Sequence, residues 1–146
     1  ELLDRCEVAS ASAARLKADL RDTGAKIDEL ALKMKHVAAY RQLKPIYDRY
    51  KASRDKEKFL RGHESEIILF EAAARECKRL GAVPLPATER MQAEIDELNA
   101  RKAILKAELQ KAQRKEQDYA AMRQNVEDFL SPPQPERERK KNVELE

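Results

Sequence analysis

A dense group of cationic and aromatic side chains lies near the middle of the sequence. Between Lys33 and Arg61 there are ten basic residues and three acidic ones, a local net charge of +7 in a chain whose total is +3. Such a concentration of lysine and arginine is typical of a surface that neutralises phosphate groups. An exposed tyrosine among these cations can stack on an unpaired base. The candidate nucleic-acid-binding residues are Lys44, Tyr47, Arg49, Tyr50, Lys51, Arg54, Lys56, Lys58 and Arg61.

The same segment also fits a purely structural role. Tyr40, Leu43, Tyr47 and Tyr50 follow one another in steps of three, four and three residues, as do residues on one face of a helix. In that interpretation the rings form part of a core, and the lysines and arginines simply face the solvent. The sequence leaves both interpretations open.

Other residues that could do chemistry are too few and too scattered. Neither Cys6 nor Cys77 has a second cysteine or a histidine at metal-ligand spacing, and His36 and His63 stand alone. There is no glycine-rich phosphate loop and no serine elbow. We therefore expect no catalytic residue, no bound metal, no cofactor and no small-molecule substrate, so this chain is not expected to be an enzyme.

Two heptad patterns flank the basic segment and predict the helices that position it. Apolar or small residues recur in steps of three and four along both ends of the chain, which is the pattern of a left-handed coiled coil. The first seam contains Leu2, Cys6, Ala9, Ala13, Leu16, Leu20, Thr23, Ile27, Leu30, Met34 and Val37. The second contains Met91, Ile95, Leu98, Lys102, Leu105, Leu109, Ala112, Glu116, Tyr119, Arg123, Val126 and Leu130.

These patterns predict an all-α fold, in which long helices form either a coiled-coil hairpin or an elongated three-helix bundle. Pro45 removes a backbone donor and predicts a break in the first helix, and Gly81 predicts the end of another helix before a loop over residues 81–88. The expected single elongated domain covers residues 1–130. Its expected helices are 2–43, 46–52, 56–80 and 88–130.

The two ends of the chain suggest a piece of a larger protein. Residues 131–146 contain several prolines and many charges, which predicts a mobile tail whose last residues are consistent with a vector-derived remnant. No apolar run is long enough to cross a bilayer, so we expect no membrane contact. Two cysteines at apolar seam positions fit a reducing compartment, and we expect a cytoplasmic location.

An ordered run of residues in the centre is more specific than any periodicity. It comprises Tyr47-Asp48-Arg49-Tyr50-Lys51, Lys58-Phe59, His63-Glu64, Ile67-Ile68-Leu69, Ala72-Ala73, Leu80-Gly81 and Leu85-Pro86. This run resembles the C-terminal helical region of relaxases, the mobilisation nucleases of conjugative and integrative elements. The resemblance covers about residues 40 to 130, including the end of the last helix at Asn125–Leu130, whereas the segment before residue 40 matches only as a coiled coil.

The resemblance implies a parent protein that nicks one DNA strand through a tyrosine and a histidine-bound divalent metal. The family's histidine cluster lies in an N-terminal domain, so no catalytic residue is carried over to this chain. The chain would be an accessory region that contacts DNA, relaxosome or coupling proteins, or a second copy of itself as a homodimer. The alternative is a coiled-coil interaction or dimerisation module that does not bind DNA.

Overall fold

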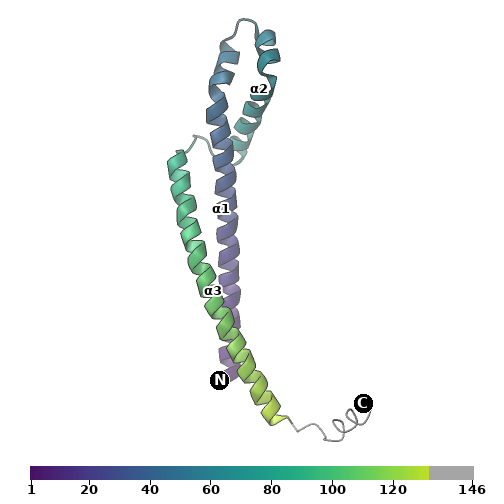
Figure 1. Ribbon diagram of the computed structural model, residues 1–146, viewed down its shortest axis with the longest axis vertical. Coiled ribbons are helices and arrows are strands. Elements are labelled where there is room, and N and C mark those ends of the chain that lie inside the picture. Colours follow the sequence, from purple (N-terminus) through teal and green to yellow (C-terminus); the bar gives the residue numbers. More distant parts are fainter. Residues whose placement is uncertain (132–146) are drawn as a thin grey trace, which may run out of the picture. The chain divides into compact units, whose positions relative to one another are not determined.

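The computed structural model describes residues 1–131, which form three α-helices and no strand (Figure 1). Helix α1 covers Leu2–Ala52, α2 covers Lys56–Arg79 and α3 covers Thr88–Leu130. The predicted all-α class is confirmed, as is the predicted last helix. The predicted tail lies outside the described residues from residue 132 onward.

The chain divides into two compact units. The central unit is Ala18–Lys106, and the terminal unit combines Glu1–Lys17 with the chain from Ala107 onward. Because α1 and α3 are long, each contributes residues to both units. The single domain expected over residues 1–130 stays a prediction.

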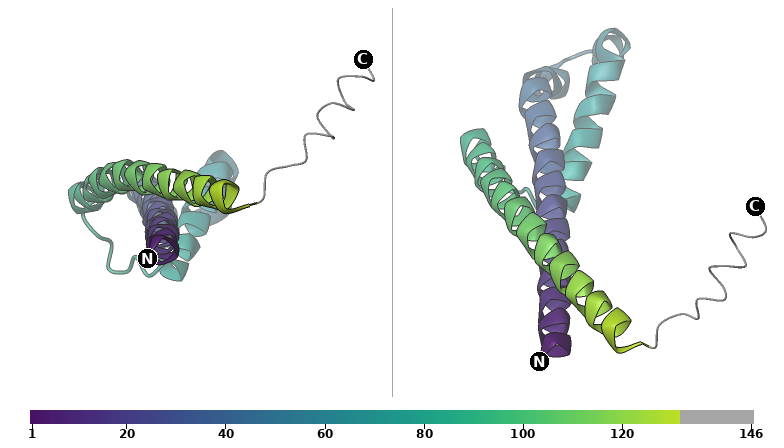
Figure 2. Two further views of the ribbon diagram at one scale, coloured as in Figure 1. Left: turned by 90° about the horizontal axis from the view of Figure 1, so that it is seen from below. Right: turned by 60° about the horizontal axis from the view of Figure 1, so that its bottom comes forward.

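The central unit contains parts of all three helices. Helix α2 folds back beside the C-terminal part of α1 (Figure 1), and Figure 2 shows the pair from two further sides. The core is a cluster of Val37 from α1, Cys77 from α2, Ala82 from the connection and Met91 from α3. Val37 and Cys77 are almost completely buried. The central unit is therefore a three-helix arrangement, one of the two architectures that the sequence left open.

A compact turn at the end of α2 directs the chain toward this core. The backbone N–H of Ala82 donates to the carbonyl of Cys77 at 2.8 Å, and that of Gly81 donates to the carbonyl of Lys78 at 3.2 Å. This is the Schellman pattern, which needs a left-handed residue after the helix, and Gly81 has φ of 72°. Glycine adopts this angle without steric cost, so the predicted helix end at Gly81 is confirmed.

Arg41 fastens the following connection to α1. Its guanidinium donates to the carbonyl of Pro86 at 2.6 Å and to the hydroxyl of Thr88 at 2.8 Å. Both acceptors lie where α3 begins. A single side chain of α1 thus joins that helix to the end of the connection and to the first residue of α3.

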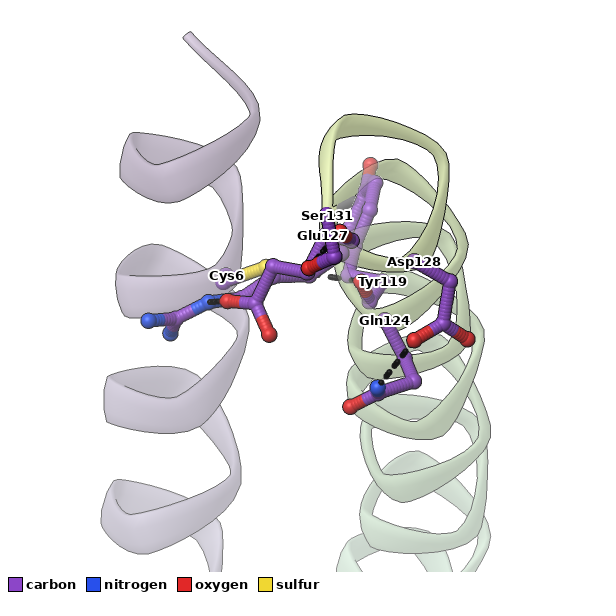
Figure 3. Close-up of polar contacts among 7 residues, drawn as sticks. Cys6, Tyr119, Gln124, Glu127, Asp128 and Ser131 are labelled. Atoms are coloured by element: carbon purple, nitrogen blue, oxygen red, sulfur yellow. Dashed lines mark hydrogen bonds and ion pairs between the residues drawn. The ribbon is translucent and has the colours of Figure 1, made fainter. Parts of the chain in front are cut away.

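Within the described residues, the terminal unit combines the first turns of α1 with the last turns of α3. Figure 3 shows Cys6 pointing from α1 toward α3, where its thiol donates to the backbone carbonyl of Tyr119 over 3.6 Å. Leu16, further along α1, lines a groove with Glu108, which lies earlier in α3. The two helices therefore run antiparallel in this unit, so it has the hairpin arrangement.

Burial follows most of the predicted heptad seams. None of the seam residues from Leu2 to Val37 is exposed, and none from Met91 to Tyr119 is exposed. The buried seam residue Thr23 uses its hydroxyl on its own helix, donating to the carbonyl of Asp19 at 2.8 Å. Because that bond is local, the hydroxyl adds no contact with a particular partner helix.

The last part of the second seam departs from the prediction. Arg123, Val126 and Leu130 are exposed, although the heptad continues through them. Val126 is 46% exposed and Leu130 is 74% exposed. A heptad pattern specifies which face of a helix is apolar, but burial requires a facing surface, and here none is present among the described residues.

The predicted break at Pro45 is wrong, because α1 continues through this residue to Ala52. Proline cannot donate to the carbonyl of Arg41, so the helix loses one bond at this point. Packing compensates for the loss. Tyr40 and Tyr47 lie on either side of Pro45 in sequence, and both rings contact Phe70 of α2, with centroid distances of 4.7 and 4.3 Å.

The predicted uninterrupted helix 56–80 also needs one correction. His63 has φ of −133° and ψ of 23°, so α2 bends there. Gly62 precedes it and offers little resistance to such a bend. After the bend, Ile67, Phe70, Ala73 and Cys77 form the buried face of α2.

Replacing Pro45 with alanine tests whether packing holds α1 together across this residue. We expect Pro45→Ala to raise the free energy of unfolding by up to about 3 kcal/mol, because it restores one helical hydrogen bond. Thermal unfolding followed by circular dichroism measures the effect. Gln42→Ala, an exposed change in the same segment, is the control and should shift stability by less than about 0.5 kcal/mol. A loss of stability in Pro45→Ala would contradict the continuous helix.

Candidate nucleic-acid interface

The candidate binding residues come together where α1 turns into α2. We define the hairpin tip as residues 44–61, which comprise the end of α1, the turn at residues 53–55 and the start of α2. All of its residues belong to the central unit. The hairpin tip has seven basic and three acidic residues, a net charge of +4. Its position at the turn of a helical hairpin brings cations from two helices together.

Every candidate cation is exposed to solvent. The Lys44 ammonium lies 3.4 Å from Asp48, and the Nε of Arg61 donates to the backbone carbonyl of Glu57 at 3.5 Å. Arg54, Lys56 and Lys58 have no ion pair among the described residues. These three side chains are therefore able to meet an external anion without first leaving a carboxylate.

Two further cations lie over aromatic rings. The Arg49 guanidinium is 5.7 Å from the ring centroid of Phe59, and the Lys51 ammonium is 5.4 Å from that of Tyr47. These distances are in the range of a cation–π attraction, which is worth about 0.5–1 kcal/mol at an exposed site. The attraction restrains the long side chains while their charges stay at the surface.

The candidate tyrosines are part of a row of aromatic rings between α1 and α2. Tyr47 stacks on Phe70 at 4.3 Å and lies 6.0 Å from Tyr50. Tyr50 in turn lies 6.2 Å from Phe59. Both tyrosines are half-buried rather than exposed. Both tyrosine rings therefore take part in packing between α1 and α2, whereas the candidate cations of the hairpin tip are exposed.

His63 belongs to the end of the same row. Its ring stacks on Phe59 with a centroid distance of 4.4 Å. Its Nδ1 lies 3.4 Å from a carboxylate oxygen of Glu66 but forms no hydrogen bond of good geometry. His63 is half-buried in this packing. Its stacking on Phe59 was not apparent from heptad spacing alone, because it depends on the bend in α2.

The N-terminus of α2 already has an acceptor. The carboxylate of Asp55 accepts a bond from the backbone N–H of Lys58 at 3.1 Å, which is the capping role expected of an aspartate there. The turn is further held by Ser53, whose hydroxyl donates to the carbonyl of Asp55 at 3.1 Å. The cap therefore removes one of the N–H groups that a phosphate could meet at this helix end and places a negative charge beside the others.

The residues outside the hairpin tip show no second chemical centre within positions 1–131. Across these described positions, no group of three or more histidine, cysteine, aspartate or glutamate side chains is arranged to hold a metal ion. Both cysteines in the sequence are free thiols. Burial raises the pKa of the Cys77 thiol, with a smaller contribution from the neighbouring Glu76 charge, whereas a hydrogen bond from Arg79 lowers the pKa of Glu76. A thiol in this state is a poor nucleophile.

Comparisons with known proteins give no functional assignment. A scan against protein-family models and searches of curated proteins and solved structures returned no match. In the described part of the chain, no helix combines the length and apolar character needed to span a membrane.

The two thiols should differ in reactivity. We expect an alkylating reagent at mildly alkaline pH to modify Cys77 more slowly than the half-buried Cys6, by roughly tenfold or more, since Cys77 is buried and its pKa is raised. Mass spectrometry of peptides over a time course measures both rates. The Cys6→Ser variant in denaturing urea is the control for the intrinsic reactivity of Cys77. Equal rates in the folded protein would contradict the buried position of Cys77.

Proposed function

We propose that this chain is a non-catalytic accessory region of a DNA relaxase, acting in the cytoplasm during plasmid or transposon mobilisation. In this role the hairpin tip contacts DNA, and the helices also provide surfaces for relaxosome or coupling proteins. The observation that carries the DNA contact is the exposure of all seven cations at the hairpin tip. The assignment to a relaxase rests on the resemblance of the run from Tyr47 to Pro86.

The positive charge of the hairpin tip supports DNA contact through the release of counterions. Lysine and arginine side chains that neutralise phosphates release condensed counterions, so affinity falls steeply as salt rises. Arg54, Lys56 and Lys58 contribute most directly, because no ion pair competes for them in the described structure. Binding of this type tolerates any base sequence, which suits an accessory contact in a complex whose specificity resides in another part.

Reversing four charges at the hairpin tip tests the DNA contact. We expect the chain to bind duplex DNA at low salt with an affinity that falls with salt. The variant Arg49→Glu/Lys51→Glu/Arg54→Glu/Lys58→Glu should lose at least about tenfold in affinity, as measured by fluorescence anisotropy.

The matched control also reverses four exposed cations, Arg101, Lys106, Lys111 and Arg114, on α3. It should retain most of the affinity if the contact is confined to the hairpin tip. Circular dichroism checks that both variants stay helical. If the hairpin-tip variant bound DNA as tightly as the unmodified chain, the proposed DNA contact would fail.

A second candidate function, self-association without DNA binding, is favoured by the terminal unit. Four apolar side chains on one face of α3 are exposed, with Met122 at 50%, Val126 at 46%, Phe129 at 88% and Leu130 at 74%. This strip continues the face through which Ala112 and Tyr119 meet α1. Exposed apolar strips of this kind are typical of interaction surfaces.

The terminal unit also contains a groove of about 310 Å³ between α1 and α3. Val8, Ala9, Ala112 and Tyr119 form its apolar lining, and Val8 is 70% exposed. We propose a second copy of this chain as the occupant. Each copy has both the exposed apolar strip and the groove in its terminal unit. In a two-fold dimer the strip of each copy can fill the groove of the other, so the same contact forms twice.

Sedimentation velocity tests the dimer. We expect the unmodified chain to dimerise at high micromolar concentration, whereas Val126→Glu/Phe129→Glu should be monomeric because each interface would bury two unpaired charges. Ile104→Glu alters an apolar residue that is 60% exposed in the central unit, and this control should not affect the dimer. A monomeric unmodified chain at that concentration would refute this second candidate.

A further inference from the structure

The aromatic row in the hairpin tip restricts how a nucleic acid could bind. Each aromatic side chain of the tip already has ring neighbours, since Tyr47 contacts Phe70 and Tyr50, and Phe59 contacts Tyr50 and His63. A base can stack only on an available ring face, and stacking is what gives proteins their preference for unpaired strands. Here the rings hold α1 and α2 together.

Cations cover part of the remaining ring surface. The Lys51 ammonium lies over Tyr47, and the Arg49 guanidinium lies over Phe59. A base stacking on either ring would therefore compete with a ring neighbour or with a charged group. The same arrangement holds the two cations near the surface of the hairpin tip, where a phosphate can approach them.

The turn before α2 also restricts how a phosphate can bind at the hairpin tip. A helix N-terminus with unpaired N–H groups is a common phosphate site. At α2 the carboxylate of Asp55 already accepts from one of these groups, the backbone N–H of Lys58. The negative charge of Asp55 also lies among the cations that would bind the ligand. Side-chain cations therefore provide the main attraction at the hairpin tip.

Resting on the proposed DNA contact, we infer that the hairpin tip reads only phosphate charge and binds the backbone of double-stranded DNA without stacking on bases. The contacts come from Arg54, Lys56 and Lys58, with Arg49 and Lys51 beside them. The binding is indifferent to base identity. It favours a duplex, because the two strands together present more phosphates per length than one strand does.

Four probes separate phosphate binding from base stacking: oligothymidylate, an abasic oligodeoxynucleotide of the same length, a DNA duplex and inorganic polyphosphate. If binding depends on phosphates alone, oligothymidylate and the abasic strand should have affinities within about threefold of each other. The duplex should bind at least as tightly as either single strand, and polyphosphate should compete with the duplex. Stacking of even one base would favour oligothymidylate by roughly tenfold or more. Fluorescence anisotropy at several salt concentrations measures all four affinities.

Two variants examine the side chains. Lys56→Gln/Lys58→Gln should lower the slope of log affinity against log salt for the duplex by about 0.9 for each lost phosphate contact. Asp55→Asn keeps a capping side chain but removes the negative charge, so duplex affinity should rise roughly two- to fivefold. Asp118→Asn neutralises an exposed acid on α3 and is the matched control, with unchanged affinity.

The outcomes distinguish this inference from the proposed function. If oligothymidylate binds tenfold more tightly than the abasic strand, the DNA contact survives but the phosphate-only inference is overturned. The same conclusion follows if polyphosphate fails to compete for the duplex. If none of the four probes binds at low salt, the proposed DNA contact itself is wrong.

Discussion

The contact of Phe70 with two tyrosines of α1 is the interaction on which the central unit depends. Tyr40 and Tyr47 lie before and after Pro45, and both rings rest on this one side chain of α2. The contact keeps α1 helical where its backbone is weakest and docks α2 against it. Phe70 is 5% exposed, so the favourable burial of a large ring accompanies both effects.

The chemistry of the hairpin tip follows from that packing. Once the aromatic residues are used to join two helices, their polar and charged neighbours are left at the surface. Two cations then rest over ring faces, and three others have no carboxylate partner in the described residues. The result is a positively charged turn with a capped helix start, and this arrangement is the basis of the proposed contact with the phosphates of DNA.

The terminal unit is held together by a seam whose buried residues are small, in contrast to the aromatic contacts of the central unit. Its seam contains Ala9 and Ala13, which allow two helices to approach closely but bury little apolar area. Two helices of this kind have no third layer to cover their other faces. Val8 on α1 and Phe129 on α3 consequently stay exposed. The exposed apolar side chains of this unit are thus a direct outcome of a thin, alanine-containing seam.

The sequence by itself determined the all-α class, the end of a helix before Gly81, the last helix from Thr88 to Leu130 and the buried seams as far as Tyr119. These features depend on local chemistry and on a repeat of seven residues, both of which are visible in one dimension. Only the tertiary structure decided that α1 passes through Pro45, that α2 bends at His63 and that Tyr47 and Tyr50 pack inward. The physical reason is that packing between segments distant in sequence is not visible in one dimension: Phe70 of α2 contacts Tyr40 and Tyr47 on either side of the proline, and the last part of the regular heptad meets no facing surface among the described residues.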